Sequence, residues 1–139
     1  MSVVVNASID RLLKATSRSF YLSLQILPNQ IKNQVGLLYL LARVADTIAD
    51  TGEEPHLLLS SLEKYKKAVS NESPPIDLTE IASLQTDSSE SDLLLSVNEV
   101  IEAFGRVGSA DRDMMLECLL TLISGQRLDI ERFGTRGSS

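Results

Sequence analysis

Apolar residues along this chain recur at intervals of three and four, which is the spacing of one face of an α-helix. The run Leu58, Leu62, Tyr65 and Val69 shows the pattern, with steps of 4, 3 and 4. Seven glycines and four prolines are few for 139 residues, and no Asn-Gly or Asp-Gly hairpin signal occurs. We therefore predict an all-α fold, a helical bundle that spans residues 1–139 as one domain.

The last long helix should be the most deeply placed. Residues 114–123 are apolar on nearly all faces, which is typical of a helix in the middle of a bundle. Cys118 falls within this stretch, and we expect it to be a small core residue. The predicted helices cover about 6–16, a short stretch through 20–24 that Pro28 ends, 29–50, the stretch after Pro55 to 69, 93–107 and 109–133.

Residues 71–92 differ from the rest of the chain in composition. They carry six acidic residues and no Lys or Arg, and they include Pro74-Pro75. We interpret this segment as an exposed acidic connector with one helical turn at 78–84.

Charge and cysteine content exclude several classes of protein. Thirteen basic and nineteen acidic residues give a formal net charge of −6, whereas a nucleic-acid-binding domain normally presents a basic patch. A single cysteine leaves no internal disulfide and no multi-cysteine zinc site. The longest apolar run, 37–42, is far shorter than the roughly 18 residues that a membrane span needs. We therefore expect a cytoplasmic protein with no nucleic-acid partner.

The segment 35–50, with the sequence VGLLYLLARVADTIAD, carries a narrow polar stripe. Most of its other positions are apolar, whereas a surface helix would carry a broad charged face. We therefore expect the stripe to face a cavity inside the bundle. The stripe residues follow one another at steps of 3, 4, 3 and 4, so they share one helical face: Gly36, Tyr39, Arg43, Asp46 and Asp50.

Two aspartates one turn apart repel each other, and burial raises the cost of their charges. A divalent cation relieves both costs, and Mg²⁺ commonly binds one or two carboxylates together with substrate phosphates. Arg43, one turn before Asp46, adds a fixed cation that suits a phosphate oxygen. A solvated pair, with Arg43 as the intrahelical partner of Asp46, is the other interpretation, and the residues alone leave both open.

The stretch 16–50 resembles the N-terminal signature of the squalene and phytoene synthases, which join two prenyl diphosphates head to head. That signature has a Ser-x-Ser-Phe element, an apolar stretch with Pro, and the pattern Tyr-x-x-x-Arg-x-x-Asp-x-x-x-Asp. The form ARVADTIAD is more similar to squalene synthases than to phytoene synthases. A second segment, SGQRLDIERF at 124–133, resembles a later helix of the family. The matching signature residues are Ser17, Ser19, Phe20, Pro28, Tyr39, Arg43, Asp46 and Asp50.

The resemblance implies the class I terpenoid synthase fold, of which this chain would form the N-terminal half. It implies that Asp46 and Asp50 bind Mg²⁺ and that Tyr39 and Arg43 act with them in catalysis. Weaker candidates for lining the substrate cavity are Tyr21, Gln126 and Asp129. The residues implied to contact the substrate diphosphate are Ser17, Arg18, Ser19, Phe20 and Arg43.

The implied reaction is the Mg²⁺-dependent condensation of two farnesyl diphosphates, through presqualene diphosphate, to squalene, with NADPH as the reductant. The alternatives are a phytoene synthase that joins two geranylgeranyl diphosphates and a non-catalytic helical fragment. The family's second Asp-rich motif has no counterpart in these 139 residues, so we expect this chain alone to be catalytically incomplete. Self-association or a partner chain would supply the other half of the fold. Peripheral contact with a membrane would allow the product to leave the protein.

Overall fold

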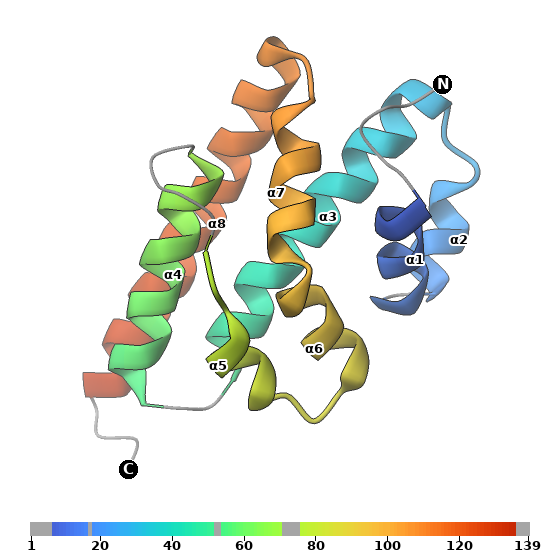
Figure 1. Ribbon diagram of the computed structural model, residues 1–139. Coiled ribbons are helices and arrows are strands. Elements are labelled where there is room, and N and C mark those ends of the chain that lie inside the picture. Colours follow the sequence, from blue (N-terminus) through green and yellow to red (C-terminus); the bar gives the residue numbers. More distant parts are fainter. Residues whose placement is uncertain (1–6, 17, 52–53, 71–75, 136–139) are drawn as a thin grey trace.

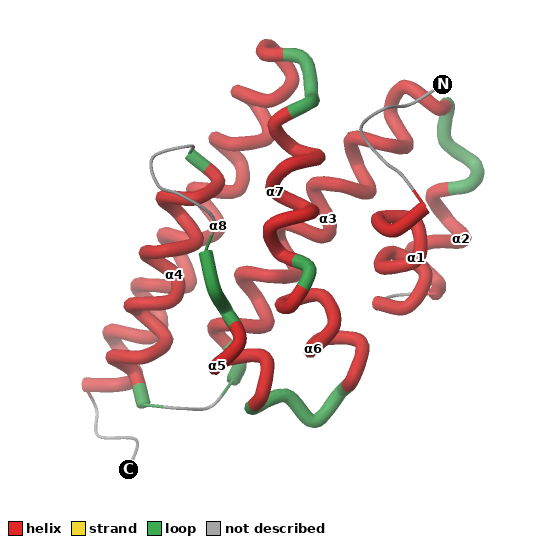
Figure 2. The backbone as a smooth tube through the Cα atoms, in the orientation of Figure 1, coloured by secondary structure: helices red, strands yellow, loops and turns green. Residues whose placement is uncertain are grey.

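The computed structural model describes residues 7–16, 18–51, 54–70 and 76–135, and only the backbone of 7–8, 16, 18–20, 29–30 and 133–135. All regular secondary structure in these ranges is helical, which confirms the all-α prediction (Figures 1 and 2). None of the helices in the described part is long and apolar enough to cross a membrane. The helices are α1 (Ala7–Thr16), α2 (Arg18–Leu24), α3 (Asn29–Ala49), α4 (Pro55–Val69), α5 (Thr79–Ser83), α6 (Ser88–Leu95), α7 (Val97–Gly105) and α8 (Ser109–Thr135).

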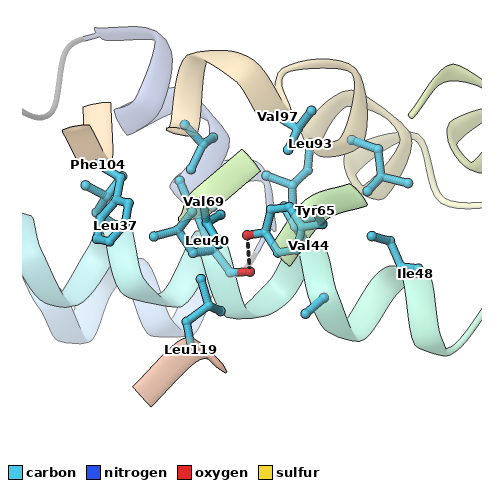
Figure 3. Close-up of a cluster of buried hydrophobic side chains, with 14 of the residues drawn as sticks. Leu37, Leu40, Val44, Ile48, Tyr65, Val69, Leu93, Val97, Phe104 and Leu119 are labelled. Atoms are coloured by element: carbon cyan, nitrogen blue, oxygen red, sulfur yellow. Dashed lines mark hydrogen bonds between the residues drawn. The ribbon is translucent and has the colours of Figure 1, made fainter. Parts of the chain in front are cut away.

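Helix α3 runs through the centre of the bundle. It packs against α1, α2, α4, α6, α7 and α8, and Figure 1 shows it passing behind α7. Leu37, Leu40, Val44 and Ile48 on α3 are wholly buried, and Figure 3 shows them in the apolar cluster. A helix that is apolar on most of its circumference can bury its apolar faces only where other helices surround it. The sequence of α3 therefore favours its position at the centre of the bundle.

A glycine lets α1 and α2 lie close against α3. A Cβ atom at Gly36 would lie 3.0 Å from a methyl carbon of Leu13 and 3.2 Å from one of Leu24. These distances are tighter than ordinary carbon contacts, so a larger residue would displace both leucines. Gly36 therefore allows α1 and α2 to approach α3 this closely.

Helix α8 lies beside α3 and α4 and not in the middle of the bundle, so that prediction was wrong. Its buried face consists of Met115, Leu119 and Ile123, while Met114 is 69% exposed. The expectation that Cys118 is a core residue was also wrong, because its side chain is exposed. In the described residues the main neighbours of α8, α3 and α4, cover only one of its faces. Only one stripe of its apolar side chains is therefore buried.

The acidic connector contains more helix than its composition suggested. Helix α5 confirms the predicted turn, and Ile81 and Ala82 on it are buried. Helix α6 begins inside the stretch expected to be exposed, and its first residues are capped by Asp87, whose side chain accepts a 2.8 Å hydrogen bond from the backbone N–H of Ser89. Acidic residues stabilise the first turn of a helix, so the acidic residues of this segment favour the start of α6.

The single helix expected at 93–107 is two helices, α6 and α7, which meet at Ser96. The backbone N–H of Ser96 caps the end of α6 by donating to carbonyl oxygens of that helix, and α7 then starts in a new direction (Figure 1). The apolar periodicity runs across the break, so it gave no signal of this bend. The bend brings the first turn of α6 alongside α3.

Tyr65 ties α4 to the central helix. Its side chain is wholly buried, and its hydroxyl donates a 2.6 Å hydrogen bond to the carbonyl oxygen of Leu41 on α3 (Figure 3). Burial raises the pKa of Tyr65 well above the ordinary tyrosine value of 10.0. The folded state therefore favours the protonated phenol, and the contribution of Tyr65 to stability is complete below pH 10.

We expect Tyr65→Phe to lower the free energy of unfolding at pH 7 by about 1 kcal/mol, because a buried hydrogen bond is lost. The wild type should then lose stability as the pH rises above 10, since its unfolded state releases a proton that the folded state retains. Above pH 10 the difference in the free energy of unfolding between the wild type and Tyr65→Phe should therefore become smaller. Urea unfolding at pH 7 and above pH 10 measures this difference. A difference that does not change with pH would contradict a raised pKa of Tyr65 in the folded protein.

Candidate functional site

The polar stripe of α3 runs from the interior of the bundle to its surface. Gly36 is buried, the side chains of Tyr39, Arg43 and Asp46 are half-buried, and Asp50 is exposed. Asp50 is the residue that caps the C-terminus of α3, and its N–H donates to the carbonyl oxygen of Asp46. The stripe is therefore not enclosed along its whole length, because α3 leaves the core at its last turn.

Arg43 is held by a residue of α6. Its Nη2 atom forms an ion pair with the Oε2 atom of Glu90, and the two side chains are 34% and 23% exposed. The Nε atom of Arg43 is buried and has no hydrogen-bond partner among the described residues. In the part of the chain that the structure describes, the ion-pair partner of Arg43 is therefore Glu90 and not Asp46, one turn along α3.

Asp46 is held by a residue of α8. Its Oδ1 atom accepts a hydrogen bond from Nε2 of Gln126. Burial and the charge of Asp50 raise the pKa of Asp46 above 3.8, and Arg43 and the bond from Gln126 lower it by less. The other amide atom of Gln126, Oε1, is buried without a partner in the described residues. The carboxylate of Asp46 thus sits in surroundings that disfavour its negative charge.

Asp46 and Asp50 are the residues that could hold a divalent cation. A cation between them would offset the cost that burial and the charge of Asp50 impose on the ionised carboxylate of Asp46, which are the two causes of its raised pKa. No group of three or more His, Cys, Asp or Glu side chains that could hold a metal occurs among the described residues. Two carboxylates fit an ion that completes its coordination with water and ligand oxygens, as Mg²⁺ does.

The predicted residues around α2 are placed less fully. Ser17 lies outside the described residues, and 18–20 lie on α2 with their side chains outside the description. Tyr21 is half-buried, its hydroxyl lies 3.2 Å from Oδ2 of Asp10, and the ammonium of Lys14 lies 5.1 Å from the centre of its ring. These contacts of Tyr21 join α2 to α1.

On α8, the structure brings one of the two predicted residues to the stripe. Gln126 contacts Asp46, whereas the side chain of Asp129 is exposed. Glu90 was not predicted, because the acidic segment around it was interpreted as a solvated connector. The spacing Asp87-x-x-Glu90 is that of a helix capping box, so the sequence did hold a signal for a helix start that would place Glu90 in a fixed first turn.

A separate groove of about 530 Å³ lies between the ends of α4 and α7 and the start of α8. Val69, Phe104 and Leu116 form part of its wall, and Arg112 and Asp113 also line it. None of the residues predicted for the site lines this groove, so the sequence motif and the groove are different places on the molecule.

Comparison with known proteins identifies the family pattern behind the stripe. A family model described as squalene/phytoene synthase matches residues 13–137 of the 139. The match includes the whole stripe of α3 and both cross-helix partners, Glu90 and Gln126. No curated protein and no solved structure matches the chain at a significant level. The match confirms the resemblance seen in the sequence, and its description covers squalene and phytoene synthases alike.

Proposed function

The chain belongs to the squalene/phytoene synthase family, and on this premise we propose that it is a squalene synthase-like prenyltransferase that binds farnesyl diphosphate at the end of α3. The observation that carries the proposal is the environment of Asp46. Its carboxylate is half-buried beside Asp50, and its pKa is raised. Surroundings that disfavour a bare carboxylate favour one that a divalent cation neutralises.

In this proposal Asp46 and Asp50 hold Mg²⁺, which would supply positive charge to stabilise the departing diphosphate. Arg43 binds a phosphate oxygen, and its buried Nε atom, without a partner in the described residues, offers a second donor on the same guanidinium. Tyr39 lies one turn before Arg43 and lines the same site. The remaining diphosphate contacts are assigned to Ser17, Arg18, Ser19 and Phe20.

The proposed reaction joins two farnesyl diphosphates. One molecule loses its diphosphate, its allylic carbon bonds to the double bond of the other molecule, and a proton leaves as the cyclopropane ring of presqualene diphosphate closes. Loss of the second diphosphate, rearrangement of the carbon cation and hydride transfer from NADPH then give squalene. The reaction requires surroundings that keep water from the cationic carbon centres. In this proposal the groups that hold the second diphosphate lie outside the described residues.

Binding of the substrate with and without metal tests this proposal. We expect farnesyl diphosphate to bind the chain measurably tighter with Mg²⁺ than with EDTA, and farnesol to show no such dependence. Geranylgeranyl diphosphate that bound tighter than farnesyl diphosphate would favour phytoene synthesis. The chain alone should release no hydrocarbon with Mg²⁺ and NADPH, and squalene formation would show that copies of this chain complete the site. Binding that ignores Mg²⁺ would contradict the metal assignment.

We also propose peripheral contact with an anionic membrane, at the corner formed by α2 and the start of α3. Leu22, Ile26 and Ile31 at this corner are 56%, 84% and 48% exposed. Residues 7–35 carry four basic residues against one acidic residue, in a chain with a net charge of −6. Exposed apolar side chains among positive charges suit the surface of an anionic bilayer.

Vesicle sedimentation tests the contact. We expect the chain to bind vesicles that contain phosphatidylglycerol better than neutral vesicles, and Ile26→Ser to reduce the bound fraction about three-fold, because less apolar surface is buried. Leu128→Ser, at a leucine of α8 that is 53% exposed, is the matched control and should bind like the wild type. Equal losses for the two variants, or no binding at all, would contradict the proposal.

A further inference from the structure

Two cross-helix contacts keep the opposite charges of α3 apart. We propose that Glu90 and Gln126 are positioning residues that prevent Arg43 and Asp46 from pairing with each other before substrate binds. The inference rests on the proposed function of the α3 site, and it concerns residues that the family signature in α3 does not include.

An arginine and an aspartate three residues apart on a helix are neighbours and tend to form an ion pair. Such a pair would occupy the carboxylate proposed for Mg²⁺ and the guanidinium proposed for phosphate, so the site would neutralise itself. In the structure each residue has another partner: Arg43 pairs with Glu90 of α6, and Asp46 accepts from Gln126 of α8. Arg43 still lowers the pKa of Asp46, so the two remain neighbours.

Helix α6 holds Glu90 in a position from which it can pair with Arg43. It lies in the first turn of α6, three residues after the N-cap Asp87. Two leucines of the same helix, Leu93 and Leu94, are fully buried and fix α6 against the core. A glutamate at this position often bonds back to the backbone N–H of the N-cap residue, but here its carboxylate reaches across to Arg43.

Gln126 suits its role because its amide is neutral. It fixes one oxygen of Asp46 and adds no positive charge, so the carboxylate keeps its charge for a cation. The next residue, Arg127, would neutralise that charge, but its Nη1 atom lies 3.1 Å from Oε1 of Glu63 on α4. Arg127 is thus paired with a residue of α4, and the side-chain hydrogen bond that α8 makes to Asp46 in the described part of the chain comes from the neutral amide of Gln126.

The first test measures binding of inorganic pyrophosphate with Mn²⁺ by calorimetry. In Glu90→Gln, Arg43 is free to turn to Asp46, and we expect the affinity to fall at least five-fold. Asp92→Asn removes one negative charge from an exposed position on the same helix, and its affinity should stay within two-fold of the wild type. Unchanged affinity in Glu90→Gln would overturn the proposal. Tighter binding would also overturn it, because Glu90 would then be a competitor of phosphate.

The second test needs no ligand, so it separates this inference from the proposed function. The Nε–H signal of Arg43 is observed by NMR and assigned by its loss in Arg43→Lys. We expect Asp46→Asn to move this signal far more in the Glu90→Gln background than in the wild type, because only there does Arg43 pair with Asp46. Equal movement in the two backgrounds would overturn the inference. Absence of pyrophosphate binding by the wild type would count against the proposed function alone.

Discussion

Replacing Asp46 by asparagine is expected to reduce turnover at least about 1000-fold in a catalytically active form of the enzyme. The amide removes the negative charge that would hold the proposed cation but keeps an oxygen that can accept a hydrogen bond from Gln126, so the bundle should stay folded. Product formation from farnesyl diphosphate measures the loss, and circular dichroism reports the fold. Asp92→Asn, at an exposed carboxylate of α6, is the control and should retain its rate. Activity of Asp46→Asn within a few-fold of the wild type would exclude the metal role.

The same substitution should raise the stability of the ligand-free protein at neutral pH. Because the pKa of Asp46 is raised in the folded state, its contribution to stability is full below 3.8 and is lost as the pH rises through the folded-state pKa. At pH 7 the charged carboxylate therefore costs stability. We expect Asp46→Asn to raise Tm by about 1–3 °C at pH 7 and to lose this advantage near pH 3.5. A lower Tm at pH 7 would contradict this.

Leu40→Ala is expected to cost the fold about 2–5 kcal/mol, because it opens a cavity at a wholly buried position in the centre of α3. This is a large share of the 5–15 kcal/mol by which a domain is typically stable. Urea unfolding followed by circular dichroism measures the loss. Leu128→Ala makes the same change on α8 at a side chain that is 53% exposed, and it should shift stability by no more than about 0.5 kcal/mol. Similar costs for both variants would contradict the central position of α3.

Periodicity was enough to predict the helices that carry the polar stripe and Gln126. The spacing of three and four gave the all-α fold, the extent of α3 and the last helix. The stripe residues share one face because helix geometry depends only on their separations. The family followed from the same positions, since the Tyr, Arg and Asp residues of the signature stand at fixed intervals.

Contacts between distant segments could not be predicted this way. Residues 114–123 of α8 are apolar on most faces, but the number of neighbouring helices decides how much of them is buried, which is why Cys118 is exposed. Composition also misled at Glu90, because acidic residues suit both a solvated loop and the first turn of a helix. The pairing of Glu90 with Arg43 depends on the bend at Ser96, which the apolar spacing does not record.

The most direct test of the central claim is to locate a bound cation in the presence of diphosphate. Paramagnetic Mn²⁺, added with inorganic pyrophosphate to ¹⁵N-labelled protein, broadens the amide signals of nearby residues. We predict that the broadened signals belong to residues 46–51, which are the last turn of α3 and the two residues after it, and to the residues around Gln126. We also predict that Asp46→Asn abolishes the effect. Broadening centred on the acidic residues 77–92, with the end of α3 unaffected, would contradict the account.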